Sequence, residues 1–181
     1  MLRRWPALVA LAFIGPDVIA AALGNASGSA EDLGDLLGQT LPMLALVYLL
    51  MAKIGNRRFT WPIVAVVVAC VVVIKMSGAV APSAVLIGAS LLLLVWVSLN
   101  GQLGRSGALR LQAIGVAFFC GLAVTGLVID PQMGTYVIAA GWLLHGVWDF
   151  VHLWRDRVVS RSFAELCGVI DVLIAIQLVL M

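Results

Sequence analysis

Long apolar blocks recur along this 181-residue chain, and they constrain its fold more than any other feature. Each block has about 18 or more mostly hydrophobic residues, enough for an α-helix to cross a hydrocarbon core about 30 Å thick. Hydrophobic residues make up 63% of the sequence and charged residues 11%, against roughly 45–50% and about 25% in soluble domains. The sequence therefore predicts an all-α, multi-pass membrane protein that forms a single integral membrane domain over residues 1–181.

Turn residues and charges divide the apolar sequence into seven predicted transmembrane helices. Proline near the first turn of several spans supports the boundaries, because a missing N–H group costs nothing there. Trp5 and Trp61 each precede such a proline, as is typical of aromatic anchors at a membrane interface. The predicted spans cover about residues 5–23, 36–54, 60–76, 83–101, 109–129, 134–154 and 163–181.

The basic residues indicate how the seven helices are oriented. With seven spans, every Lys and Arg except Lys75 falls on one side of the membrane. Cytoplasmic loops are enriched in Lys and Arg, so this side is predicted to be the cytoplasm. We therefore expect a cytoplasmic N-terminus and a C-terminus outside. The compact chain and its short loops favour a plasma membrane, specifically a bacterial inner membrane.

The first predicted span has a second interpretation, as a cleaved signal peptide. Arg3 and Arg4 precede an apolar run that ends in small residues (AALGNASG), which is the layout of a secretory signal. Pro16 and Asp17 interrupt that run, and its length matches the other spans, so an uncleaved helix is favoured. Cleavage of residues 1–24 would leave six helices and would not change the orientation of the rest.

Several other protein classes fit the sequence poorly. Cys70, Cys120 and Cys167 are odd in number and lie in apolar segments, which favours small buried packing residues over disulfides. The basic residues are scattered singly or in pairs along the cytoplasmic edge, which argues against nucleic-acid binding and leaves membrane lipids as expected partners. The last span has no lysine for retinal, and two histidines are too few for membrane desaturases or ceramidase-related hydrolases.

Most charges lie at the ends of the predicted spans, but five ionisable residues lie inside them and a sixth, Glu165, lies near the start of the last span. Five of these six belong to the last hairpin. Ionisable side chains inside a membrane are costly and tend to mark function. Three of them, in the sixth span, lie within about 60° on one helix face at about 100° per residue. Those three are His145, Asp149 and His152; the others are Asp17, Glu165 and Asp171.

Residue counting from the cytoplasmic ends places the two helices of the last hairpin in register. His145 and Asp171 lie at similar distances from those ends, about 12–14 Å deep at about 1.5 Å per residue. The same count pairs Asp149 with Gly168 and His152 with Glu165. Gly168 would let the two helices approach closely. We therefore expect two histidines and three carboxylates to meet in the inner half of the bilayer.

One hypothesis for this cluster is an intramembrane enzyme or metal-binding protein that acts on a lipid-like substrate. Imidazole and carboxylate groups on neighbouring turns suit Zn²⁺ or Fe²⁺. The candidate metal ligands are His145, Asp149, His152 and Glu165. The candidate catalytic residues are His145, Asp149, His152 and Asp171, because a His–Asp pair without metal can act as a general base.

Two further hypotheses remain open. The chain could be a small ion- or proton-coupled transporter, in which Asp17 beside Pro16 lines a cavity at a break in the first span. Such a transporter would need to form a homo-oligomer, because seven short helices enclose little volume. Alternatively, the cluster only locks two helices together, since hydrogen bonds between membrane helices contribute about 0.6–2 kcal/mol each.

Overall fold

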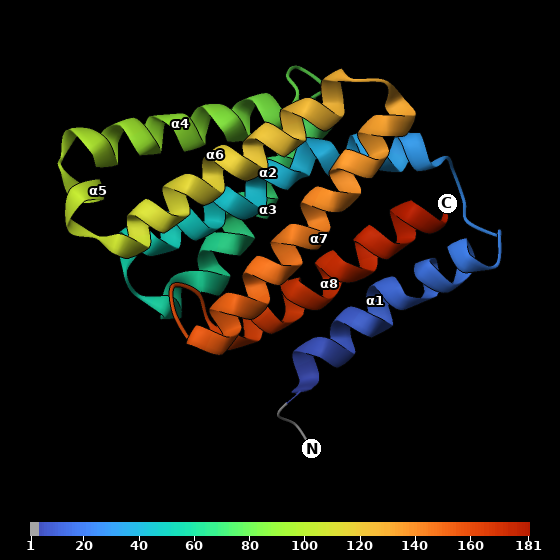
Figure 1. Ribbon diagram of the computed structural model, residues 1–181, viewed down its shortest axis with the longest axis horizontal. Coiled ribbons are helices and arrows are strands. Elements are labelled where there is room, and N and C mark those ends of the chain that lie inside the picture. The colour runs from blue at the N-terminus through green and yellow to red at the C-terminus, as the bar shows by residue number, and fades with distance from the viewer. Residues whose placement is uncertain (1–3) are drawn as a thin grey trace.

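The computed structural model describes residues 4–181 and is built of helices (Figure 1). Those residues form eight α-helices, one short 3-10 helix and no strand. The elements are α1 (Trp5–Ala22), α2 (Ala30–Ile54), η2 (Arg57–Phe59), α3 (Thr60–Ser77), α4 (Pro82–Leu99), α5 (Gln102–Arg105), α6 (Gly107–Val128), α7 (Pro131–Arg155) and α8 (Arg161–Leu180). Arg3, which contributes to the predicted orientation, lies outside the described residues.

Six helices are long and apolar enough to cross a membrane, which supports the predicted membrane class. They are α1, α2, α3 together with η2, α4, α6 and α8. α7 has 25 residues but does not belong to this set, because His145, Asp149 and His152 lower its mean hydropathy. The structure is therefore a helical bundle of membrane type, and a seventh span stays a prediction.

α2 begins at Ala30, whereas the sequence predicts a span that starts at about residue 36. The Ser29 side chain caps the helix by accepting a hydrogen bond from the backbone N–H of Asp32 at 3.0 Å. Glu31 and Asp32 then occupy the first turn, where the helix dipole favours negative charge. The predicted boundary is late because hydropathy marks only the apolar part of a helix, and this helix has a polar first turn.

α2 occupies the middle of the bundle and contacts α3, α4, α6, α7 and α8. Its different faces contribute to three separate hydrophobic clusters. Leu41 packs with α7 and α8, Leu49 packs with α6, and Met51 packs with α3 and α8. Because neighbours surround α2, the hydroxyl of Tyr48, which is also buried, needs a hydrogen-bond partner inside the bundle.

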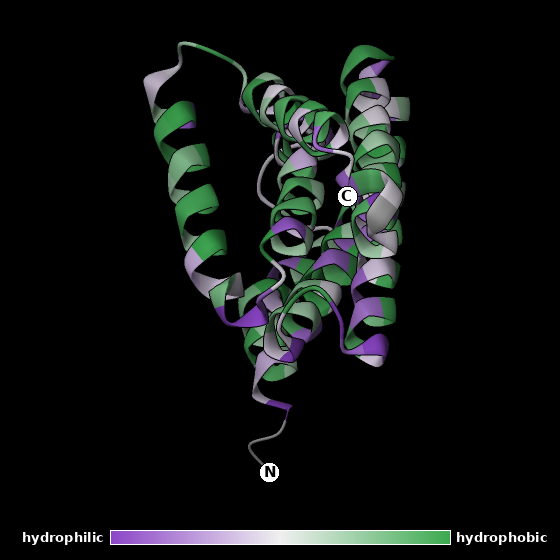
Figure 2. Cartoon of the chain, turned by 90° about the vertical axis from the view of Figure 1, so that its left-hand side faces the viewer, coloured by the Kyte–Doolittle hydropathy of each residue, from purple (hydrophilic) through white to green (hydrophobic). Residues whose placement is uncertain are grey.

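α1 lies along α8 at the edge of the bundle (Figures 1 and 2). It is continuous from Trp5 to Ala22, with Pro16 inside it, so the break predicted around this proline does not occur. A proline inside a helix removes one hydrogen bond, and the remaining turns keep α1 in one piece. Asp17 is exposed on this peripheral helix and does not join the ionisable residues of α7 and α8.

The polar parts of the chain gather toward one end of the molecule, near the N-terminus (Figure 2). There the α2–α3 connection contacts the α7–α8 connection. The Arg57 guanidinium forms an ion pair with Asp156 and also donates to the Asp156 carbonyl at 2.8 Å. The backbone N–H of Ser160 donates to the Thr60 hydroxyl at 3.0 Å. Two connections that the charge pattern assigns to the same side of the membrane therefore lie against each other.

The three cysteines are unpaired and differ in exposure. Cys120 is buried on α6, as expected of a small packing residue, and Cys167 on α8 is partly buried. Cys70 is exposed, so the expectation of burial is wrong for this residue. The reason is the peripheral position of α3, where only Thr60, Val67 and Val71 are buried.

Candidate functional site

Two glycines let α7 and α8 approach closely beside the ionisable residues. A Cβ atom on Gly146 would lie 3.2 Å from the carbonyl oxygen of Gly168 and 3.3 Å from the Cβ of Asp171. A Cβ atom on Gly168 would lie 3.3 Å from the Cβ of Asp149. Because both positions lack a side chain, the backbones come near enough for a group on one helix to bond to a group on the other.

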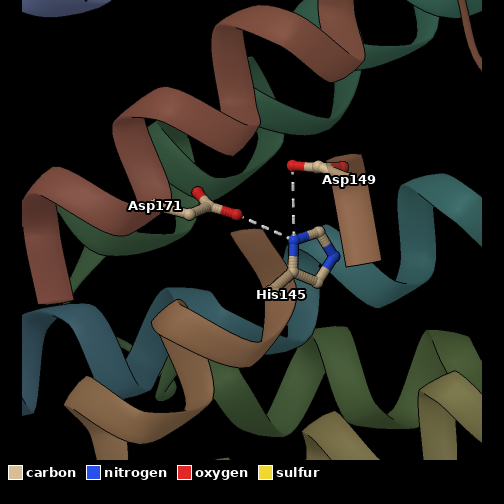
Figure 3. Close-up of side chains that lie close together, drawn as sticks. All are labelled: His145, Asp149 and Asp171. Atoms are coloured by element: carbon tan, nitrogen blue, oxygen red, sulfur yellow. Dashed lines mark hydrogen bonds and ion pairs between the residues drawn. The ribbon is translucent and has the colours of Figure 1, made fainter. Parts of the chain in front are cut away.

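His145 lies between two carboxylates (Figure 3). Its Nδ1 atom is 2.8 Å from Asp171 Oδ2 on α8 and 3.6 Å from Asp149 Oδ2 one turn further along α7. All three side chains are buried, with exposed fractions of 0–1%. The depth matching predicted from the sequence therefore agrees with the contact between His145 and Asp171.

Tyr48 of α2 adds a fourth side chain to this group. Its hydroxyl donates a hydrogen bond to Asp149 Oδ1, and its ring packs edge-on against His145 with the ring centroids 5.6 Å apart. Asp149 Oδ2 has no hydrogen-bond partner, and neither has Nε2 of His145, although both atoms are buried. We call His145, Asp149, Asp171 and Tyr48 the buried cluster; its members come from α2, α7 and α8.

His152 does not join the ligand atoms of the buried cluster. Its Nδ1 lies 2.8 Å from the carbonyl oxygen of Trp148, and its Nε2 lies 2.9 Å from the amide nitrogen of Gln112 on α6. A carbonyl oxygen only accepts, so Nδ1 carries a proton, and the amide nitrogen only donates, so Nε2 accepts. His152 is thus a neutral imidazole with both ring nitrogens occupied, and a metal would have to displace one of these bonds.

Glu165 is also separate from the buried cluster. It lines a groove between α1, α7 and α8, together with residues such as Arg4 and Arg161. Its Oε1 atom is buried and has no hydrogen-bond partner. The expected meeting of two histidines and three carboxylates is therefore reduced to one histidine and two carboxylates in the described structure. The cause is rotational: Glu165 and Asp171 are six residues apart, or about 120° apart around α8 at 100° per residue.

The buried cluster has an unbalanced charge. With Asp149 and Asp171 both ionised, its net charge is negative whether His145 is neutral or protonated. A buried uncompensated charge is unfavourable in free energy, and proton uptake or a bound cation removes it. Hydrogen bonding from Tyr48 relieves only part of it. An additional proton or a bound cation would compensate this charge.

The three ligand atoms are arranged compactly enough for a metal ion. One nitrogen of His145 and one oxygen from each aspartate all lie within 4.8 Å of one another. Metal–ligand distances of about 2.0–2.2 Å, as for zinc with nitrogen and oxygen, separate ligand atoms by roughly 3–4 Å. A small inward movement of the carboxylates would thus complete a three-ligand site, in which Asp149 is held by Tyr48. Among the described residues, no other group of His, Cys, Asp and Glu is as compact.

Sequence reasoning missed two residues of this region, Tyr48 and Gln112. Both are polar side chains within long apolar segments, and both are buried, with exposed fractions of 1% and 2%. A polar group in such a segment signals a buried partner, but the signal does not name the partner. The hydrogen bonds to Asp149 and His152 join residues 101 and 40 positions apart, which only the three-dimensional packing reveals.

Comparisons of this chain with protein-family models, with curated proteins and with solved structures found no match.

Proposed function

We propose that the chain crosses the membrane seven times, with α7 as the seventh span. At about 1.5 Å per residue, its 25 residues would extend roughly 37 Å, more than the hydrocarbon core of about 30 Å. α7 packs against α2, α6 and α8, so its polar face is turned to protein and not to lipid. The charge pattern supports a cytoplasmic N-terminus and an outer C-terminus, and the compact chain with short loops favours a bacterial plasma membrane.

The function that the geometry supports best is that of a membrane protein with a divalent metal ion at His145, Asp149 and Asp171. The observation that carries this proposal is one buried imidazole nitrogen facing two buried carboxylates. A divalent cation with a neutral imidazole and two carboxylates makes an electrically neutral site, which suits a low-dielectric interior. Nitrogen and oxygen ligands are compatible with Zn²⁺ or Fe²⁺.

An intramembrane enzyme acting on a lipid-like substrate remains the proposed use of that metal. A bound Zn²⁺ or Fe²⁺ would supply Lewis-acid activation of water or of a substrate carbonyl or phosphoryl oxygen. The residues of the chain bind and orient: Tyr48 fixes one oxygen of Asp149, and the ion would take the place of the proton that now joins Nδ1 of His145 to Asp171. Because these side chains are buried, a substrate can reach them only when α7 separates from a neighbouring helix.

Metal binding is tested on the purified, detergent-solubilised protein, stripped with a chelator and reloaded with Zn²⁺ or Fe²⁺. We expect the wild type to retain metal at an equimolar ratio. Asp171→Asn should bind the metal more than about 100-fold more weakly. Mutating a residue that only supports a metal ligand already lowers metal affinity roughly 10–100-fold, and Asp171 is a proposed ligand itself. Asp17→Asn is the matched control, since Asp17 is a carboxylate on an exposed part of α1. Absence of metal from the reloaded wild type, or equal binding by both variants, would overturn the proposal.

Proton-coupled transport is a second candidate, and the hydrogen bond between His145 and Asp171 favours it. A buried imidazole at 2.8 Å from a carboxylate can share and release one proton, which is the element of a proton relay. In this case His145→Gln should abolish proton flux in proteoliposomes, while the reloaded wild type retains no metal. The two candidates thus predict opposite results in the metal measurement.

A further inference from the structure

The groove between α1, α7 and α8 has a different composition from the buried cluster. It measures about 450 Å³ and lies at the beginning of α1 and of α8. Arg4 and Arg161 supply positive charge, Glu165 supplies negative charge, and Ser162 supplies a hydroxyl group. A surface with both signs of charge and a hydroxyl in one concavity is suited to a ligand that also carries both signs.

Polarity changes along this groove from the helix ends inward. The charged residues stand at the start of α1 and in the first turns of α8. Deeper along the helices the lining becomes apolar, with Phe150 of α7 and Val169 of α8. Trp5, which is 46% exposed, stands at the charged end, where membrane proteins place interfacial aromatic residues. This gradient matches a phospholipid, with its charged headgroup at the interface and its acyl chains in the core.

The first turn of α8 adds further attraction for an anionic group. α8 has 20 residues, and its Ser160 N-cap makes no side-chain capping hydrogen bond. The first N–H groups of a helix have no partner within the helix, and the helix dipole places partial positive charge there. Together with the guanidinium groups of Arg4 and Arg161, this end of α8 would favour a phosphate group.

Glu165 supplies the negative charge of the groove. Its Oε1 atom is buried and lacks a hydrogen-bond donor, which is costly for a carboxylate oxygen. Glu165 nevertheless lines the groove, where a primary ammonium group beside the phosphate would supply the opposite charge and N–H donors to the carboxylate. A choline headgroup has no N–H to donate, and a glycerol headgroup has no positive charge.

We propose that this groove binds the headgroup of a phosphoethanolamine lipid, with the phosphate at Arg4, Arg161 and the start of α8, and the ammonium at Glu165. The proposal is independent of the metal site, which lies on other side chains of α7 and α8. The proposed membrane orientation determines only which leaflet supplies the lipid, and with a cytoplasmic N-terminus this is the cytoplasmic leaflet.

The experiment reconstitutes the full-length protein in vesicles of equimolar phosphatidylethanolamine and phosphatidylcholine, extracts it in a mild detergent, and counts retained lipids by native mass spectrometry. We expect the wild type to prefer phosphatidylethanolamine by about tenfold, the size expected of one charge-assisted hydrogen bond. Glu165→Gln should bring that preference close to parity. Glu31→Gln, at the other glutamate of the chain and on α2, should leave it unchanged.

A second variant tests the phosphate half of the site. Arg4→Gln should reduce retention of both lipids, whereas Arg110→Gln on α6, also an exposed arginine, should not. Equal retention of both lipids by the wild type, or an unchanged preference in Glu165→Gln, would overturn the proposal. Preferential retention of phosphatidylglycerol from vesicles that contain it would also overturn it, because that headgroup has no ammonium for Glu165.

Discussion

Helices α7 and α8 follow each other in the chain, and so do α3 and α4, yet the two pairs are stabilised in different ways. α7 and α8 pack along their length through glycines, and they bury His145, Asp149 and Asp171 between themselves and α2. α3 and α4 barely contact each other, and many of their apolar side chains are exposed. Val73 of α3 and Leu92 of α4, for example, are 65% and 74% exposed.

The polar groups of the two pairs show the same difference. Ser90 of α4 is fully buried, but its hydroxyl donates to the Leu86 carbonyl of its own helix at 2.8 Å. The hydrogen-bonding requirement of this hydroxyl is therefore met within α4, whatever the position of α4 relative to its neighbours. The carboxylates of α7 and α8 depend on partners from other helices. Apart from hydrogen bonds near their first turns, such as Ser83 to Gln39 of α2 and Ser160 to Thr60, α3 and α4 are held by apolar contacts. Residue-specific polar contacts inside the bundle fix α7 relative to α8 and α2.

The largest effect is expected from His145→Ala. Removing this side chain leaves Asp149 and Asp171 buried without their shared partner, and loss of one member of a buried ionic group costs about 3–5 kcal/mol. The free energy of unfolding, measured by tryptophan fluorescence in detergent, should fall by this amount. Val73→Ala on α3 should change it by well under about 1 kcal/mol.

A double variant distinguishes loss of charge compensation from loss of packing. If uncompensated carboxylates cause the effect, adding Asp171→Asn to His145→Ala should restore part of the lost stability. A double variant less stable than the single one would instead mean that packing of the imidazole dominates. The contrast between the two helix pairs would then rest on shape and not on charge.

The next effect in size is expected from Gly146→Leu. A Cβ atom at this position already lies 3.0–3.3 Å from Val172, Gly168 and Asp171, so a larger side chain must push α8 away. Overpacking of this kind costs about 1–3 kcal/mol. Gly88→Leu on α4 is the matched control, because nothing lies within 4 Å of a Cβ atom there. Thermal unfolding midpoints of the two variants give the comparison; equal midpoints would contradict the specific packing of α7 on α8.

Helix positions and depth along a helix were predictable from the sequence, because they follow from local patterns and a constant rise per residue. The contact of His145 with Asp171 is an example, because the two residues are at similar distances from the connected ends of α7 and α8 and so lie at the same depth. Depth alone does not specify to which side of its helix a residue points. Glu165 is at the level of His152, but it faces the groove beside α1, and His152 faces Gln112 of α6.

The neighbours of α7 were not predictable in the same way. Which helices surround it depends on how all the apolar faces pack together. When a helix is apolar on almost every side, its sequence does not indicate which side faces a neighbour. α3 and α4 illustrate this, since their sequences predict two helices but not that they barely touch. The role of Tyr48 was therefore not predictable from the sequence, because α2 is apolar around it and only the assembled bundle brings its hydroxyl to Asp149.

The smallest effect is expected from Tyr48→Phe, which removes one hydroxyl group and keeps the ring. Asp149 Oδ1 would lose its donor inside the bundle, at a cost of about 1–2 kcal/mol in unfolding free energy. Tyr136→Phe on α7 is the control, because this side chain is half exposed. If Asp149 is a metal ligand, Tyr48→Phe should also weaken Zn²⁺ binding about tenfold, since it removes the group that orients the carboxylate. Lost stability with unchanged Zn²⁺ binding would show that the Tyr48 hydroxyl joins α2 to α7 and plays no part in orienting a metal ligand.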